Sequence, residues 1–499
     1  MTMASSCIAG LLLLLAAAAA GLATPVEYQY HSYAVTPLSP HTYSVPAADD
    51  DGARARQEDV AVSPSALHVR LLHRDSFAVN ATPAQLLARR LQRDELRAAW
   101  IIKAAAPAAA ANDTPVVGLS SGGAFVAPVV SRAPTTSGEY MAKIAVGTPA
   151  VEALLAMDTG SDITWLQCQP CRRCYPQSGP VFDPRHSTSY REMGYDAPDC
   201  QALGRSGGGD AKRMTCVYAV GYGDDGSTTV GDFIEETLTF AGGVQVPHMA
   251  IGCGHDNKGL FAAPAAGILG LGRGQISCPS QIAALGYNVT SFSYCLADFF
   301  LSSPGRSVSS TLTIGDGAAA GSPPPSFTPT VQNLNMATFY YVRLVGVSVG
   351  GVRVPGVTED DLKLDPYTGR GGVILDSGTA VTRLARRAYI AFRDAFRAAA
   401  VDLGQVSIGG PSGFFDTCYT MGGRAMKVPT VSMHFAGGVE LTLPPKNYLI
   451  PVDSMGTVCF AFAGTGDRSV SIIGNIQQQG FRVVYNIGGG RVGFAPNSC

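Results

Sequence analysis

The chain contains one short pattern twice, each time directly after an apolar run that suits a buried strand. The first copy is Asp158-Thr159-Gly160-Ser161 and the second is Asp376-Ser377-Gly378-Thr379. In both, an aspartate leaves the sheet at a tight turn, where glycine lets backbone N–H groups approach the carboxylate. Two such turns predict duplicated halves that each bring one aspartate to a shared centre.

The duplication continues downstream of each aspartate. Ile268-Leu269-Gly270 follows the first, and Ile472-Ile473-Gly474 follows the second. A single Asp-Thr-Gly or Asp-Ser-Gly sequence is an ordinary turn. The matched set is an internal repeat far longer than a solenoid unit, and it favours a functional pair.

Bulk composition narrows the fold class. The 499 residues suffice for two or three domains, and 58 glycines, 32 prolines and 46% hydrophobic residues are typical of a β-rich protein with many turns. A net charge of −2 gives no electrostatic support for nucleic acid or an anionic membrane as a partner.

The N-terminus reads as a secretory signal covering residues 1–23. It has an unbroken apolar run over 8–20 and small residues suited to cleavage after Ala23. No later stretch is expected to anchor the chain in a membrane. Secretion is consistent with the glycosylation sequons at Asn80, Asn112 and Asn288. Signal removal takes Cys7 and leaves eleven cysteines, so one thiol is left over or bonds another molecule.

Residues 24–132 differ in composition from the remainder. Pro, Ala, Ser and charged residues dominate, and the one good helical pattern covers 84–103, with an apolar stripe among Arg89, Arg90, Arg93 and Arg97. We interpret this region as a removable basic pro-segment ahead of an acidic site. A solvated low-complexity tail is the alternative.

Short strands separated by glycine and proline begin after residue 137. Strands are expected at 140–146, 233–240, 339–349, 428–435 and 481–485, and helices at 279–285 and 386–399. The Pro-rich stretch 321–329 is the expected connection between an N-terminal lobe (137–325) and a C-terminal lobe (326–499).

Two carboxylates about one hydrogen bond apart do not both ionise easily, so they share a proton. One takes a proton from a water between them while the other donates to the carbonyl oxygen of a peptide bond. Gly160 and Gly378 permit close backbone approach. Ser161 and Thr379 are expected to donate hydroxyl hydrogen bonds to the carboxylates, and Thr159 and Ser377 to bridge the lobes.

These motifs resemble the pepsin-like aspartic endopeptidases, over about 138–499. Further motifs are similar to the nepenthesin-like branch of plants: Cys168-Gln-Pro-Cys171-Arg-Arg-Cys174, Phe292-Ser293-Tyr294-Cys295, Gly474-Asn475-Ile476-Gln477-Gln478-Gln479 and Leu72-His73-Arg74-Asp75-Ser76. The segments 251–261 and 446–453 are most similar to the guard-cell type of plant aspartic protease.

The resemblance implies an all-β, two-lobed pepsin-like fold with few short helices and the catalytic aspartates Asp158 and Asp376 at the floor of a cleft. Tyr222 matches the tyrosine of the family's flap, with one extra residue, Asp225, in the hairpin, and Trp165 matches the tryptophan that holds its hydroxyl. The family implies a secreted monomer that cleaves protein or peptide substrates without metal or organic cofactor. The apoplast is the favoured destination and the vacuole the alternative.

The resemblance also bears on the cysteines. It implies a bridge between Cys418 and Cys459, pairing of Cys200 with Cys216 and of Cys295 with Cys499, and Cys278 as the odd thiol. Pairing among Cys168, Cys171, Cys174 and Cys253 stays open.

Some of these residues also admit other interpretations. Cys168, Cys171 and Cys174 are better explained by disulfides than by a zinc or redox site, because no second C-x-x-C or suitably spaced histidine accompanies them. Arg383, Arg386 and Arg387 are interpreted as a solvated helix face. The main alternative function is a secreted, catalytically inactive pepsin-like inhibitor or binding protein, which the retained aspartates and hydroxyl neighbours disfavour.

Overall fold

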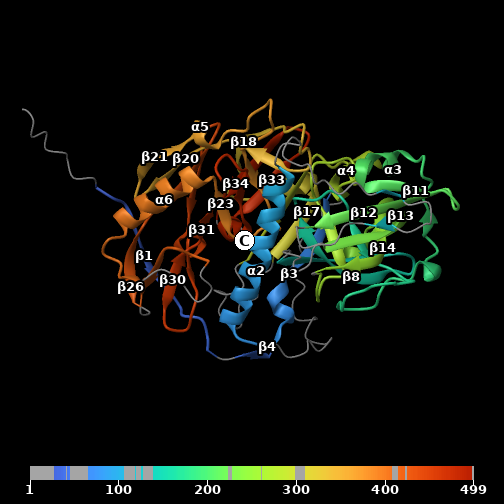
Figure 1. Ribbon diagram of the computed structural model, residues 1–499, viewed down its shortest axis with the longest axis horizontal. Helices are drawn as coiled ribbons and strands as arrows, with labels where there is room; N and C mark the ends of the chain where they lie inside the picture. Colours follow the sequence, from blue (N-terminus) through green and yellow to red (C-terminus); the bar gives the residue numbers. More distant parts are fainter. Residues whose placement is uncertain are drawn as a thin grey trace, which may run out of the picture.

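The computed structural model describes residues 27–40, 42–44, 66–105, 118–119, 125–126, 139–222, 227–259, 261–297, 310–406, 414–421 and 424–496. Strands dominate two lobes, one formed by the first half of the chain and one by the second. Helix α2 (Pro83–Ala104) lies between them (Figure 1). Among the described residues, no helix combines the length and apolar character needed to cross a membrane.

Strands make up most of the N-terminal lobe where the structure describes it, together with short α-helices. The strands are β7 (Tyr140–Val146), β8 (Val151–Asp158), β9 (Trp165–Gln167), β10 (Arg191–Glu192), β11 (Gly207–Asp210), β12 (Thr215–Tyr222), β13 (Ser227–Thr239), β14 (Gln245–Lys258), β15 (Gly267–Gly270), β16 (Ser291–Cys295) and β17 (Ser310–Gly315). The helices are α3 (Pro198–Ala202) and α4 (Cys278–Ala284).

The C-terminal lobe has the same strand-rich character. Its strands are β18 (Ser326–Val331), β19 (Tyr340–Val342), β20 (Leu344–Val349), β21 (Val352–Thr358), β22 (Val373–Leu375), β23 (Thr382–Leu384), β24 (Gln405–Val406), β25 (Cys418–Thr420), β26 (Ala425–Pro429), β27 (Val431–Phe435), β28 (Val439–Leu443), β29 (Leu449–Pro451), β30 (Thr457–Phe460), β31 (Phe462–Gly464), β32 (Ser471–Ile473), β33 (Arg482–Asn486) and β34 (Arg491–Ala495). Its helices are α5 (Glu359–Leu362), α6 (Arg386–Ala399) and α7 (Asn475–Gln478).

The N-terminal segment forms strand pairs with both lobes. It contributes β1 (Tyr30–Ala34), β2 (Tyr43–Ser44), β3 (Ala66–His73), the 3₁₀ turn η2 (Arg74–Phe77), β4 (Val79–Ala81), α2, β5 (Gly118–Leu119) and β6 (Phe125–Val126). Strand β3 is antiparallel to both β7 and β17, so it lies between them in the large sheet. Strand β1 pairs with β26 of the C-terminal lobe.

The internal repeat of the sequence becomes a repeated strand pairing. In the first half β8 runs parallel to β15, with Asp158 opposite Gly270. In the second half β22 runs parallel to β32, with Leu375 opposite Ile473. Each apolar-apolar-glycine triplet therefore supports the strand that ends at one of the two aspartates.

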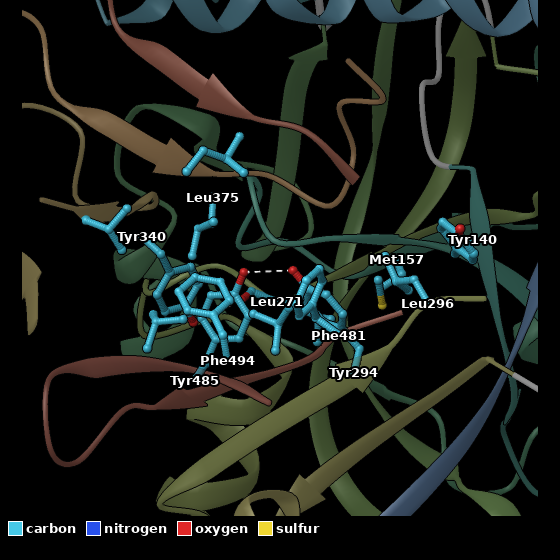
Figure 2. Close-up of a cluster of buried hydrophobic side chains, with 14 of the residues drawn as sticks. Tyr140, Met157, Leu271, Tyr294, Leu296, Tyr340, Leu375, Phe481, Tyr485 and Phe494 are labelled. Atoms are coloured by element: carbon cyan, nitrogen blue, oxygen red, sulfur yellow. Dashed lines mark hydrogen bonds between the residues drawn. The ribbon is translucent and has the colours of Figure 1, made fainter. Parts of the chain in front are cut away.

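A buried apolar cluster fixes these strand ends (Figure 2). Met157 and Leu375, the residues directly before the two aspartates, both belong to it. Its aromatic part includes Tyr294 and Tyr485, whose hydroxyls are 2.9 Å apart, and Phe292, which stacks on Tyr485. Close packing of this kind leaves little freedom for the turns that follow.

Most predicted elements agree with the observed ones, but two expected strands are divided and the expected lobe connection is partly a strand. The strand expected over 339–349 divides at Arg343, between β19 and β20. The helix expected over 84–103 is α2, and the one over 386–399 is α6. The strand expected over 428–435 divides at Thr430, between β26 and β27. The stretch 321–329, expected as a connection, ends in β18, which pairs with β34.

Disulfides join Cys168 to Cys253, Cys171 to Cys174, Cys200 to Cys216 and Cys418 to Cys459. Cys278 is buried and unpaired. Cys295 is disulfide-bonded, and Cys499, its expected partner, lies outside the described residues. Of the three sequons, Asn80 and Asn288 have exposed side chains, and Asn112 lies outside the described residues.

Candidate active site between the two lobes

The two aspartate turns are joined by reciprocal hydrogen bonds. The backbone N–H of Ser377 donates to Oγ1 of Thr159 at 2.9 Å, and the N–H of Thr159 donates to Oγ of Ser377 at 3.1 Å. Each hydroxyl also lies 3.4 Å from a carbonyl oxygen of the opposite strand, that of Leu375 or Met157. The turns are thus held face to face by two residues that the sequence places in equivalent positions.

Asp158 and Asp376 are buried, with 3% and 0% of each residue exposed. Backbone N–H groups of Gly160 and Gly378 donate to them, at 2.9 and 3.4 Å, and Oγ1 of Thr379 donates to Asp376 at 2.5 Å. Ser161, expected to serve Asp158 in the same way, has a buried hydroxyl without a hydrogen-bond partner among the described residues. The oxygens of Asp158 are engaged by another group instead.

That group is the guanidinium of Arg97, on α2. Its Nη1 and Nη2 donate to Asp158 at 3.0 and 2.5 Å, and its Nε and Nη2 donate to Asp376 at 3.2 and 3.0 Å. Because Nη2 bonds both aspartates, one oxygen of each lies within hydrogen-bonding reach of a single point. Two aspartates from distant parts of the sequence therefore share one centre, occupied by one cation.

Charge compensation appears in the pKa values. Burial raises the pKa of Asp376, Arg97 opposes this shift, and the nearby Asp158 adds to it. Burial alone would lower the pKa of Arg97, but the two carboxylates outweigh it and raise that pKa. A guanidinium is the side chain suited to this position, because it stays charged and presents a planar fork of donors.

The glycine after the first aspartate is required by close approach. A Cβ at Gly160 would lie 2.4 Å from Nη2 of Arg97 and 2.8 Å from Oδ1 of Asp376. Any larger residue would push the opposite carboxylate or the guanidinium out of place.

Helix α2 presents charged groups from several successive turns toward the two lobes. Arg90, Asp94, Arg97 and Ile101 follow each other at helical spacing and are all buried. Asp94 accepts hydrogen bonds from the N–H groups of Ala380 and Val381 and from Nη2 of Arg383, the last at 2.6 Å. The interpretation of Arg383 as solvated is therefore wrong: it is buried in β23, whereas Arg386 and Arg387 are exposed.

The expected tyrosine and tryptophan lie beside the same helix. Nε1 of Trp165 donates to the hydroxyl of Tyr222 at 3.0 Å, and Phe261 packs against both rings. Trp100 of α2 lies 6.5 Å from the Tyr222 ring, centroid to centroid. Burial raises the pKa of Tyr222 well above its usual range. The rest of the hairpin tip, residues 223–226, lies outside the described residues.

The apolar end of α2 packs against the strand that leads to Asp376. Ala98 and Ile101 are buried in one cluster with residues of the C-terminal lobe: Phe339, Tyr341, Ile374, Val470 and Ile472. Helix α2 thus places a cation on the two aspartates, an aromatic ring beside Tyr222 and an aliphatic side chain in the apolar cluster of the C-terminal lobe.

A second buried charge cluster holds the start of α2. Arg90 Nη2 lies 3.0 Å from Asp75 and 2.9 Å from Nε2 of His73, and Arg93 forms a bidentate pair with Glu139. His73, Asp75 and Glu139 have ligand atoms within 4.8 Å of one another, the spacing of a metal site. The guanidinium of Arg90 already supplies the positive charge there, so this cluster is explained as an ion-pair network.

Comparisons with known proteins agree with this geometry. Family models described as xylanase inhibitor N-terminal and C-terminal match residues 140–316 and 339–496. Aspartyl protease family protein 2 of Arabidopsis thaliana is 50% identical over 87% of this chain and 86% of its own. The guard-cell aspartic protease 2 of the same plant is 42% identical over 88% of each chain. The chain belongs to the plant family of pepsin-like aspartic proteases.

Nepenthesin-1 of Nepenthes gracilis is also a relative, 39% identical over 72% of this chain and 78% of its own. The resemblance read from the sequence is therefore confirmed, and the protein is an aspartic-type endopeptidase acting on peptide or protein substrates. Solved structures agree on the fold alone: soybean basic 7S globulin has a TM-score of 0.56 at 20% identity, covering 71% of this chain and 92% of its own. The expected all-β, two-lobed fold is confirmed.

Sequence reasoning missed the residues of the N-terminal segment that reach the site. Arg97 was recognised only as one basic residue of a helix, and Asp94 was not singled out. The sequence did contain a signal, namely charged residues on the apolar face of the helix. Arg90, Asp94 and Arg97 recur at helical spacing beside the apolar residues Leu87, Leu91 and Ala98, so both sets face the same way.

The reciprocal bonds between the turns predict energetic coupling. Thr159→Val and Ser377→Ala each remove one hydroxyl, and the double variant removes both. We expect a coupling free energy of roughly 0.5–3 kcal/mol in a double-mutant cycle on chemical unfolding. Strictly additive effects would show that the turns are positioned independently.

Docking of α2 is predicted to weaken on acidification. The two ring nitrogens of His73 face donors, the N–H of Asp75 and Nη2 of Arg90; a neutral ring accepts at one of these nitrogens, and an imidazolium accepts at neither. Burial lowers the pKa of His73 well below its usual range; Arg90, Arg93 and Arg74 add to this, and Glu139 opposes it. The docked state thus excludes a proton that a freed His73 binds below about pH 6.5.

Glu139 also weakens the docking of α2 as the pH falls. Burial opposes its ionisation, but Arg93 and Arg90 outweigh burial and lower its pKa, so docking weakens further once a freed Glu139 would protonate. The fluorescence of Trp100 should follow the release. His73→Asn keeps a cap acceptor without titrating and should move the midpoint to lower pH; an unchanged midpoint would exclude His73 as a contributor.

Proposed function

We propose that the intact chain is an inactive precursor in which α2 blocks a catalytic pair, Asp158 and Asp376. The contact of one guanidinium with both carboxylates carries the proposal. In this assignment residues 1–23 are a signal peptide, 24–132 a pro-segment, and 137–325 and 326–499 the two catalytic lobes.

Catalysis begins when Arg97 leaves. Two buried carboxylates at that spacing do not both stay ionised, so they take up one shared proton. A water bound in place of the guanidinium then has a carboxylate to accept its proton, and the partner carboxylic acid donates to the oxygen of the scissile carbonyl. The water oxygen forms the new bond to the carbonyl carbon, and collapse of the tetrahedral intermediate breaks the C–N bond. Proton transfer to the departing nitrogen completes hydrolysis.

The neighbours of the pair have supporting roles. Gly160, Gly378 and Thr379 stabilise the ionised carboxylates through the hydrogen bonds already described. Ser161 gains Asp158 as an acceptor once Arg97 has gone, which explains a buried hydroxyl without a partner in the precursor. Thr159 and Ser377 keep the two carboxylates at a fixed separation.

Substrate replaces α2 in the cleft. An extended peptide places side chains where Trp100 and Ile101 now lie, beside Tyr222 and in the pocket of Phe339 and Tyr341. Tyr222, held by Trp165, closes over the bound peptide. We infer apolar residues on either side of the cleaved bond.

The precursor is proposed to enter the secretory pathway and to act as a monomer outside the cell, with the vacuole as the alternative destination. The disulfides joining Cys168 to Cys253 and Cys418 to Cys459 support an oxidising compartment. The exposed side chains of Asn80 and Asn288 are compatible with glycan attachment.

The catalytic assignment predicts that Asp158→Asn and Asp376→Asn each abolish hydrolysis in the processed protein. Each variant loses a proton-transfer group, and we expect kcat to fall by roughly 10²–10⁴-fold or more. The rate at which the processed variants cleave a denatured protein at acidic pH measures this loss, and circular dichroism is the control for folding. Normal turnover by either variant would refute the shared pair.

The blocking role predicts that Arg97→Ala activates the unprocessed chain. Loss of the cation leaves two buried carboxylates uncompensated, which costs docking about 3–5 kcal/mol. The intact variant should cleave a short peptide substrate that the intact wild type does not cleave. Arg89→Ala is the matched control, because Arg89 is an exposed arginine of the same helix. If the two variants are equally inactive, Arg97 is not what blocks the pair.

A further inference from the structure

A second contact between the N-terminal segment and the enzyme body lies outside the cleft. Strand β1 pairs antiparallel with β26, from Tyr30 opposite Pro429 to Ala34 opposite Ala425. In Figure 1 this pair lies at the outer end of the C-terminal lobe, away from α2. Among the described residues β26 has β1 as its sole partner strand, so the segment completes an otherwise unpaired edge.

Backbone bonds extend this pairing at both ends. The N–H of Gln29 donates to the carbonyl of Gly350 at 2.7 Å, and the N–H of Thr430 donates to the carbonyl of Gln29 at 3.0 Å. Further along, the N–H of Leu38 donates to the carbonyl of Asp453 at 3.0 Å. The C-terminal lobe therefore binds residues 29–38 as an extended peptide, through hydrogen bonds to its backbone.

Side chains add contacts that depend on the sequence of the segment. Val35 and Leu38 are 3% and 6% exposed. Val35 lies in the main apolar cluster, which spans both lobes, and Leu38 lies in a cluster that joins the C-terminal lobe to α2. The hydroxyl of Tyr30 donates to the carbonyl of Ala399, and that of Tyr33 to the carbonyl of Leu449, both at 3.2 Å.

The lobe is also shaped to admit the segment. The ring of Tyr28 lies over Gly350, where an added Cβ would come within 2.6 Å of it. Gly350 has a φ of 59°, a conformation that side chains disfavour, so both its backbone and the space above it call for glycine.

We propose that the C-terminal lobe carries a peptide-binding site separate from the cleft, and that residues 28–38 remain bound there after the chain between residues 44 and 66 is cut. The occupant is an extended peptide with tyrosines on the strand and two aliphatic anchors, Val35 and Leu38, behind it. The processed enzyme is then a two-chain complex. The inference needs no catalytic activity and stands apart from the roles proposed for Asp158, Asp376 and Arg97.

The test replaces residues 51–56 of the full chain with the recognition sequence of a site-specific protease. The folded protein is cut at neutral pH and passed through a gel-filtration column, and the protein peak is analysed by mass spectrometry. We expect the severed N-terminal peptide in the protein peak at about one per molecule. Separation of the wild-type peptide from the body on the column would overturn the proposal.

Variants distinguish this site from retention through β2, which pairs with β4. Val35→Ala combined with Leu38→Ala should reduce the retained peptide at least tenfold, whereas Thr36→Ala, at an exposed position of the same segment, should leave it unchanged. Equal retention in all three proteins would assign the attachment to β2 and contradict the proposal. Adding an Asp376→Asn background removes self-cleavage and keeps the result independent of catalysis.

Discussion

Two carboxylates and one guanidinium, all buried between the lobes, hold α2 over the two aspartates. Transferring an ion from water to a protein interior costs several kcal/mol, and two like charges at hydrogen-bonding range add repulsion. Arg97 offsets both costs because its planar fork bonds Asp158 on one side and Asp376 on the other. The same burial that suits the carboxylates to the proton transfer we propose therefore makes them a strong binding site for the helix that covers them.

Protons link the covered and open states. When α2 leaves the cleft, His73 becomes free to bind a proton, and Glu139 becomes free to do so at lower pH. The two aspartates then share one proton. All three changes favour release as the pH falls, and the residues concerned contact successive turns of α2, at Arg90 and Arg93 and at Arg97. The N-terminal segment thus combines an acid-sensitive attachment at the cleft with a strand on the C-terminal lobe, where none of these groups lies.

The aspartate pair could be predicted from sequence because its geometry is encoded locally and twice. Each turn follows its own strand, and Thr159 and Ser377 occupy equivalent positions, so the symmetry of the sequence implies the symmetry of the contact. Arg97 could not be placed in this way, since its partners are 61 and 279 residues away and the contact depends on how a helix docks. Strand β1 was hidden by a Pro- and Ser-rich composition, although Tyr30 and Tyr33 are residues that strands favour.

The most direct measurement of the central claim is hydrogen–deuterium exchange of the backbone amides of α2 in the intact protein at neutral pH. If the guanidinium holds the helix between the carboxylates, these amides exchange slowly in the wild type and on the order of 10²-fold or more faster in Arg97→Gln, while the amides of the core strands are unchanged. Equal, slow exchange of α2 in the two proteins would show that the helix is held without this interaction and would contradict the account.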